Sequence, residues 1–222
     1  MSIFSFNFLR SVTAQAVIWP PIDFELIEAR NAGLLRGHIL NAGAGWRDLS
    51  HLIEGALINQ DITWPGDDRK NVDIFSPLHD IPVSNATFDT ILCIAVLEHV
   101  VNPDEIIPEF FRVLKPGGYV IASVPFLQPE HKIPTDYQRY TKDGLERRFL
   151  RNNFEVVSTR NVFNVYFTLH WIVYEWLHLS DSLIYKALRV AILPLLLYLA
   201  KTSRLSSDKL ASVFQIIARK PV

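Results

Sequence analysis

The chain has 222 residues, which is enough to bury a sizeable core and is most simply one domain with an appendage. Its formal net charge is −1 and its charged residues are scattered, so no basic patch indicates a nucleic-acid partner and no charge run indicates disorder. The single cysteine, Cys93, excludes an internal disulfide and suits a reducing cytoplasm.

The first 36 residues predict a helical lead-in that is interrupted at Pro20 and Pro21. The apolar residues near its start lack the basic region and the long apolar core of a signal peptide, so we expect no cleaved leader. After the lead-in, residues 38–40 predict a short strand that runs into the loop Asn41-Ala42-Gly43-Ala44-Gly45. A strand, a glycine-bearing loop and a helix in this order are typical of a ligand-binding turn.

Further short elements alternate up to residue 87. We expect a short helix ending at Gly55, a strand at 56–59 that stops at Asp61, a turn at 65–68 and a strand at 71–74.

The next strand begins at Phe88, and its apolar run at 91–96 is typical of a strand buried on both faces. Asn102-Pro103-Asp104 predicts the start of a helix, with acidic residues favouring the helix dipole. We expect Pro116-Gly117-Gly118 to end that helix and turn the chain into a strand at 119–124.

The last third predicts a helix at 141–152 and strands at 154–158 and 213–218. Between these strands, residues 161–210 form a long apolar insertion that we expect to be helical. Its two uncharged stretches, 162–174 and 190–200, are each shorter than the roughly 18–20 apolar residues that span a bilayer.

Three motifs follow one another in the middle of the chain: Phe88-Asp89, then Leu97-Glu98-His99-Val100, then Arg112-Val113-Leu114-Lys115-Pro116-Gly117-Gly118. This succession resembles the class I S-adenosylmethionine-dependent methyltransferases, in particular the type 11 group. The resemblance covers residues 37–160 and the final strand. It implies an α/β Rossmann-like three-layer sandwich with a seven-stranded, mostly parallel sheet, whose last strand is antiparallel. The domains would be the lead-in at 1–36, the methyltransferase domain at 37–160 plus 211–222, and the apolar insertion at 161–210.

The resemblance also implies S-adenosylmethionine as the cofactor and places its binding residues. The loop would wrap the methionine and ribose, Asp61 would hold the ribose hydroxyls, and Ile62 or Leu78 would stack on the adenine. The full predicted set is Asn41, Ala42, Gly43, Gly45, Asp61, Ile62, Leu78 and Ala95.

Three positions depart from the family pattern. Asn41 replaces an acidic residue, Arg47 replaces a third glycine, and Pro77 replaces the aspartate that would contact the adenine amino group. Asp73 or Asp80 could take over that contact, or either could be a solvated loop carboxylate.

His99 and His131 are the candidate general bases, because imidazole titrates near neutral pH. His99 could instead only orient its loop through a backbone hydrogen bond. In some quinone-pathway relatives a carboxylate-rich version of this segment holds a divalent metal. Ala95 here removes one ligand, so we expect no metal.

The polar, aromatic segment 129–141 resembles a substrate loop of one type 11 subgroup. Phe126, His131, Tyr137 and Arg139 are the predicted substrate contacts. Asp136 and Arg139 could alternatively form a structural pair that closes the loop.

Three interpretations of the insertion remain open at this point: an interfacial membrane contact, a helical cap on the domain, and a homodimer interface. Trp171, Tyr174 and Trp176 favour the membrane interface, and Pro194 predicts a kink.

We therefore expect methyl transfer to a small or lipid-linked acceptor, most simply at oxygen, by a cytoplasmic protein associated with a membrane. The rival is a catalytically silent methyltransferase-like scaffold or binding module at a membrane, which the three departures favour. A nicotinamide-dependent reductase is a more distant alternative, because it would want a glycine at Asp48.

Overall fold

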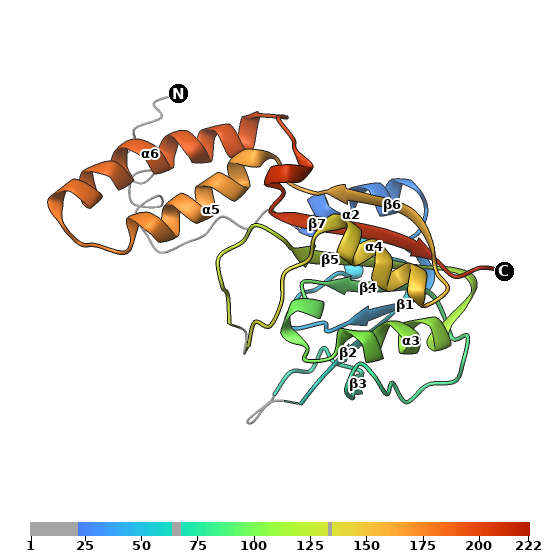
Figure 1. The fold of residues 1–222 in the computed structure, drawn as a ribbon. Coiled ribbons are helices and arrows are strands. Elements are labelled where there is room, and N and C mark those ends of the chain that lie inside the picture. The colour runs from blue at the N-terminus through green and yellow to red at the C-terminus, as the bar shows by residue number, and fades with distance from the viewer. Residues whose placement is uncertain (1–21, 64–67, 133–134) are drawn as a thin grey trace. The chain divides into compact units, whose positions relative to one another are not determined.

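A seven-stranded sheet with the strand order β3-β2-β1-β4-β5-β7-β6 forms the centre of the computed structural model, which describes residues 22–63, 68–132 and 135–222 (Figure 1). The elements are α2 (Ile22–Asn31), β1 (Arg36–Ala42), η1 (Ser50–Leu52), β2 (Glu54–Asp61), β3 (Ile74–Phe75), β4 (Phe88–Ile94), η2 (Leu97–His99), α3 (Pro103–Val113), β5 (Leu114–Pro125), α4 (Lys142–Arg151), β6 (Glu155–Asn161), α5 (Val165–Leu177), α6 (Leu183–Thr202), η3 (Asp208–Leu210) and β7 (Val213–Arg219).

Strands β3, β2, β1, β4 and β5 are parallel to their neighbours. Strand β7 runs antiparallel to β5, because Gly117 bonds to Lys220 at one end and Phe126 bonds to Ser212 at the other. The carboxyl ends of the parallel strands share one edge of the sheet, which is where this class of fold binds ligands. The predicted fold class is therefore confirmed, including the helical insertion before the last strand.

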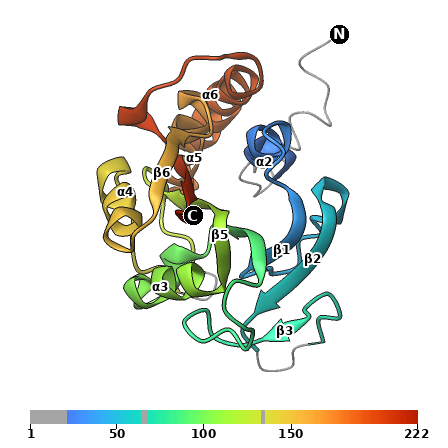
Figure 2. The same ribbon diagram turned by 90° about the vertical axis from the view of Figure 1, so that its right-hand side faces the viewer.

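Helices cover both faces of the sheet, with α3 and α4 on one face and α2 on the other (Figure 2). Leu26 and Ala29 of α2 are fully buried in a core that also contains Ile39, Leu92 and Ile121 from three strands. Part of the predicted lead-in is thus a helix packed on the sheet. Residues 1–21 and the predicted turn at 65–68, except for Asp68, lie outside the described residues.

The chain forms two compact units. The first comprises residues 21–125, 131–160 and 214–222 and holds most of the sheet. The second comprises residues 126–130 and 161–213 in the described part of the chain. In the second unit α5 and α6 pack as a hairpin around a small core of Tyr174, Leu177, Leu193 and Leu197.

The segment Pro116-Gly117-Gly118 does not end a helix, so this prediction was wrong. Helix α3 already ends at Val113, and β5 begins at Leu114. The β4–β5 register shifts between the pairs Phe88–Leu114 and Thr90–Tyr119, so the proline and glycines form an irregularity within β5. At Gly118 an added Cβ would lie 2.8 Å from the Asp89 carbonyl oxygen, which explains the glycine.

Two shorter predictions also need correction. The expected helix before Gly55 is only the three-residue turn η1. The expected strand at 71–74 is the two-residue β3, which pairs with Gln60 and Asp61 at the end of β2. Segments this short bury too few residues for a periodic pattern to fix their bounds.

Candidate functional site

The glycine loop leaves β1 in a backbone conformation that glycine adopts far more easily than other residues. Gly43 and Gly45 have φ of 72° and 60°, in the left-handed region. The backbone N–H groups of Gly43 and Ala44 donate to the Gln60 carbonyl, and a Cβ on Gly43 would lie 2.5 Å from Val96 Cγ2. The loop therefore lies directly against the turn that follows β4. At Gly45 an added Cβ would meet no atom within 4 Å, so space lies open beside the loop.

Asp61 ends β2 beside the loop, as predicted, but its carboxylate already has several donors. Oδ2 accepts from Gly45 N at 2.8 Å and from Arg69 Nη1 at 2.6 Å. Oδ1 accepts from the N–H of Ile62 at 2.7 Å. Arg69 is buried and lies over the ring of Trp46. Among the described residues, Asp61 therefore keeps one unused acceptor position, on Oδ1.

Other predicted cofactor residues lie around this point. Asn41 is buried at the end of β1 and donates to Asn59, and Ala42 is fully buried beside it. Ile62 is 44% exposed whereas Leu78 is buried, so Ile62 offers more surface for stacking. Of the two carboxylates that could substitute for Pro77, Asp73 already accepts from the Asn59 N–H.

A strained turn connects β4 to the candidate bases. Ala95 has φ of 56°, a conformation that is costly for a residue with a Cβ, and its N–H donates to Ser123. Leu97–His99 then form η2, in which Glu98 is fully buried. The backbone strain directs this turn toward the carboxyl edge of the sheet.

The loop after β5 is fastened onto this turn by several hydrogen bonds. Tyr137 N–H donates to the Glu98 carbonyl, and Gln138 donates to the carbonyls of Leu97 and Val100. The Tyr140 hydroxyl also donates to Leu97, and burial raises the pKa of this hydroxyl. Hydrogen bonds therefore join segments that lie some forty residues apart in the sequence.

This structure brings the two predicted bases together. The rings of His99 and His131 meet edge to face at 5.2 Å, and both Nε2 atoms face Glu98 Oε1, at 3.8 Å and 3.6 Å. The sequence assigned Glu98 no role of its own, because no spacing pattern joins residue 98 to residue 131.

The alternative interpretation of Asp136 and Arg139 as a pair also has support. Arg139 grips the Asp136 carboxylate with both terminal nitrogens, and Asp136 accepts from the His131 N–H at 2.8 Å. Burial raises the pKa of Asp136, but the hydrogen bonds from Arg139 and His131 outweigh it and bring the pKa to about 2. Tyr137 is 53% exposed and open to a substrate, and Phe126 is half-buried in the second unit.

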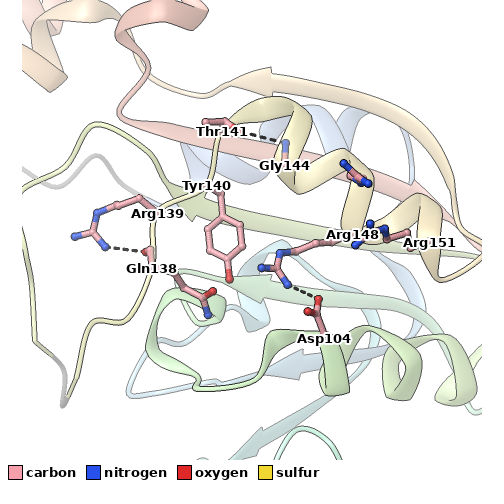
Figure 3. Close-up of a pocket in the computed structure, with 9 residues that line it drawn as sticks. Asp104, Gln138, Arg139, Tyr140, Thr141, Gly144, Arg148 and Arg151 are labelled. Atoms are coloured by element: carbon pink, nitrogen blue, oxygen red, sulfur yellow. Dashed lines mark hydrogen bonds and ion pairs between the residues drawn. The ribbon is translucent and has the colours of Figure 1, made fainter.

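A separate hollow of about 370 Å³ lies between the start of α3 and α4 (Figure 3). Arginines 139, 147, 148 and 151 line it together with Asp104, which pairs with Arg148. It contains none of the predicted donor-binding residues, so it is distinct from the glycine loop.

Comparison with known proteins agrees with these features. Residues 67–122 match the methyltransferase domain family. Over 40 residues the chain is 45% identical to ubiquinone biosynthesis O-methyltransferase of Paracidovorax citrulli (strain AAC00-1), a match that covers 18% of this chain and 17% of that protein. Over residues 67–122 the chain therefore resembles the type 11 methyltransferases.

Solved structures show that this chain shares its fold with distant proteins. Phosphoethanolamine N-methyltransferase 2 of Haemonchus contortus, in complex with S-adenosyl-L-methionine, has a TM-score of 0.59 at 13% identity over 98% of this chain and 58% of its own. The 1,6-didemethyltoxoflavin-N1-methyltransferase of Burkholderia thailandensis has a TM-score of 0.57 at 18% identity, covering 98% and 84%. The [4+2]-cyclase SpnF has a TM-score of 0.57 at 18% identity, over 94% of this chain and 84% of its own.

The resemblance to methyltransferases implies S-adenosylmethionine as the methyl donor, and the residues present fit it. The left-handed glycine loop has open space beside Gly45, and Asp61 Oδ1 retains an acceptor position for one ribose hydroxyl. The difference from the predicted bidentate contact is Arg69, which occupies Oδ2. Nothing in the spacing of the sequence indicates that Arg69 would reach Asp61.

Proposed function

We propose that the chain transfers a methyl group from S-adenosylmethionine to an oxygen of a small or lipid-linked acceptor. The observation that carries the proposal is the contact of Gly43 with Val96, which sets the donor loop against the turn holding Glu98 and His99. An acceptor bound beside these residues would lie next to the donor's methyl group. The bound donor supplies an activated methyl on its sulfonium, so the protein mainly has to align the reactants and exclude water.

Oxygen is the acceptor atom that the side chains favour, because a hydroxyl must lose a proton as it is methylated. Basic atoms of Glu98, His99 and His131 lie within 4.8 Å of one another beside the turn after β4. The fastened loop keeps both imidazoles half-buried, with side chains 14% and 13% exposed, which limits competition from water.

A lipid-linked acceptor is favoured by the α5–α6 hairpin. Helix α6 is long and apolar enough to cross a membrane by length and composition, and only 22% of its most apolar window is buried. The helix has 20 residues and is longer than the uncharged stretch at 190–200, because it also includes Lys186 and Arg189. We propose that this hairpin contacts the membrane interface and so brings the domain to acceptors held there.

Titration calorimetry with S-adenosylhomocysteine tests the donor site. We expect binding by the wild-type protein and a loss of at least about tenfold in Asp61→Ala, since one charged hydrogen bond is worth about 1.5–3 kcal/mol. Asp143→Ala, an exposed carboxylate on α4, should bind like the wild type. Absence of binding by well-folded wild-type protein would overturn the enzyme and favour the silent scaffold.

Transfer of an isotope-labelled methyl group tests the acceptor class. Membrane extracts and water-soluble hydroxyl compounds would be offered separately, and mass spectrometry of the product would identify the methylated atom. A label on nitrogen or carbon alone would contradict the oxygen assignment.

A further inference from the structure

Three potential ligand atoms converge where the loop after β5 meets η2. One carboxylate oxygen of Glu98 and one ring nitrogen each of His99 and His131 all lie within 4.8 Å of one another. They come from two segments that backbone hydrogen bonds hold together, so the grouping is built into the fold.

Glu98 is the most telling member of the group. It is fully buried, and among the described residues neither of its carboxylate oxygens has a hydrogen-bond partner. An unsatisfied buried carboxylate is costly, and such a group needs a counter-charge or a ligand. The Nε2 atoms of His99 and His131 lie 3.8 and 3.6 Å from Glu98 Oε1, which is too far for hydrogen bonds.

Those separations suit ligands that share an ion. Two ligand atoms at about 2.0–2.1 Å from a tetrahedral ion lie roughly 3.3–3.5 Å apart, close to the observed spacing. A small inward movement of the side chains would complete the coordination.

The outer nitrogens of both histidines are oriented as in metal sites. His99 Nδ1 lies at 2.5 Å from the Thr135 carbonyl oxygen, an acceptor, so Nδ1 carries the hydrogen and Nε2 is left with its lone pair. His131 Nδ1 faces Asp136 Oδ2 at 3.7 Å, and Arg139 holds that carboxylate in place. A carbonyl or carboxylate behind each ligating imidazole fixes its tautomer and raises its affinity for metal.

We propose that Glu98, His99 and His131 bind a divalent first-row transition ion such as Zn²⁺. Two imidazoles and one carboxylate favour these ions over Mg²⁺ and Ca²⁺, which prefer oxygen ligands. We expected no metal from the sequence, because Ala95 removes one ligand. In this proposal His131, from the loop after β5, supplies the third ligand instead. Three protein ligands leave a position open, as in catalytic sites.

The open position suggests how the ion would serve the reaction, and this part rests on the proposed function. A hydroxyl oxygen of the acceptor bound there would release its proton to a solvent water more easily, because the ion would stabilise the alkoxide or phenoxide. That oxygen would then take the methyl group as the C–S bond of the donor's sulfonium breaks. The histidines would then orient the acceptor through the ion instead of taking its proton themselves.

Equilibrium dialysis of the purified full chain against Zn²⁺, without any donor, tests the site. We expect one tightly held ion per chain, and a loss of at least about tenfold in affinity in Glu98→Gln and in His131→Gln. His51→Gln changes an exposed histidine on η1 and should bind like the wild type. Co²⁺ would give the strong visible bands of a low-coordinate site, weakened in the same two variants.

The outcomes separate this proposal from the proposed function. The metal site is overturned if Zn²⁺ does not bind the wild type. It is also overturned if Zn²⁺ binds Glu98→Gln and His131→Gln as tightly as the wild type, with circular dichroism showing that the variants are folded. Asp61→Ala should keep the ion while losing S-adenosylhomocysteine. Glu98→Gln should lose the ion and still bind S-adenosylhomocysteine.

Discussion

Gly43 is the residue on which the contact between the donor loop and the β4 turn depends. Replacement by alanine would combine a left-handed backbone with a Cβ 2.5 Å from Val96 Cγ2. We expect Gly43→Ala to lower the free energy of unfolding by about 2–4 kcal/mol, from the backbone cost and overpacking together. S-adenosylhomocysteine binding should weaken at least about tenfold, which calorimetry and urea denaturation would measure.

Gly45→Ala provides a matched control, because Gly45 is also left-handed but an added Cβ meets nothing within 4 Å. Its loss in stability should be only about 1–2 kcal/mol. Adding Val96→Ala to Gly43→Ala should recover part of the lost stability by removing the clash. Equal losses at the two glycines would show that the contact with Val96 carries no weight.

In the proposed donor site, Arg69 would compete with the donor for Asp61. Because its guanidinium occupies Oδ2, we expect Arg69→Ala to free that oxygen for a second ribose hydroxyl. S-adenosylhomocysteine should then bind about three- to tenfold more tightly in calorimetry, a gain of roughly 0.7–1.4 kcal/mol. Weaker binding in Arg69→Ala would instead assign Arg69 to building the donor site.

The site residues were predictable to different degrees. The residues at the ends of β1 and β2, Asn41, Gly43 and Asp61, were placed from a strand followed by a loop. Arg69 and Glu98 were not given roles, because their significance comes from contacts made across the fold. A pattern along the chain reports which face a residue occupies, and it does not report which distant group meets it there.

At the scale of elements, an ion pair within α3 also forms hydrogen bonds to the segment before β4. Glu109 accepts from Arg112 with both oxygens and from the Ile81 N–H, and Arg112 also donates to the carbonyls of Ile81 and Val83. The arginine of the Arg112–Gly118 motif thereby holds the loop that leads into the central strand. The hydrogen bonds from Arg112 outweigh burial and lower the pKa of Glu109.

This pair predicts a pH-dependent stability. A carboxyl whose pKa is lower in the folded state stabilises the fold above its unfolded pKa, and this contribution is lost as the pH falls through the folded value. We expect Glu109→Gln to cost about 1–3 kcal/mol in urea denaturation at pH 7, and less as the pH falls below about 4. Glu105→Gln on the same helix is exposed and should change little at either pH. A pH-independent cost for Glu109→Gln would assign the effect to packing.

The elements themselves show where sequence patterns suffice. β4 and α3 were placed to within a few residues, because a doubly buried strand and an amphipathic helix have unmistakable apolar periods. Pro116-Gly117-Gly118 was misplaced, since proline and glycine mark both helix ends and strand irregularities. The pairing with β4 and the hydrogen bond of Gly117 with Lys220, about a hundred residues away, distinguish the two.

At the scale of the whole molecule, the chain joins a unit that holds most of the sheet to a helical hairpin with a different surface. The hairpin closes at a turn where Arg189 donates to the carbonyls of Leu177 and Ser180 and pairs with Asp181. Around this turn the apolar side chains of Leu179, Leu183 and Ile184 are 72–84% exposed. We call these three residues the hairpin tip. Exposed apolar side chains at this density indicate an interaction surface.

We expect the hairpin tip to insert into membranes. Leu183→Ser together with Ile184→Ser should reduce co-sedimentation with phosphatidylglycerol-containing vesicles at least about tenfold, since burying each side chain contributes about 1.5–3 kcal/mol. Lys186 is exposed near the hairpin tip, so vesicle binding should increase with anionic lipid and weaken as the salt concentration rises. Leu150→Ser removes a comparably apolar residue, 56% exposed on α4, and should leave vesicle binding unchanged. If the wild-type protein does not bind vesicles but is a dimer, and the double variant is a monomer, the hairpin tip would be assigned to self-association.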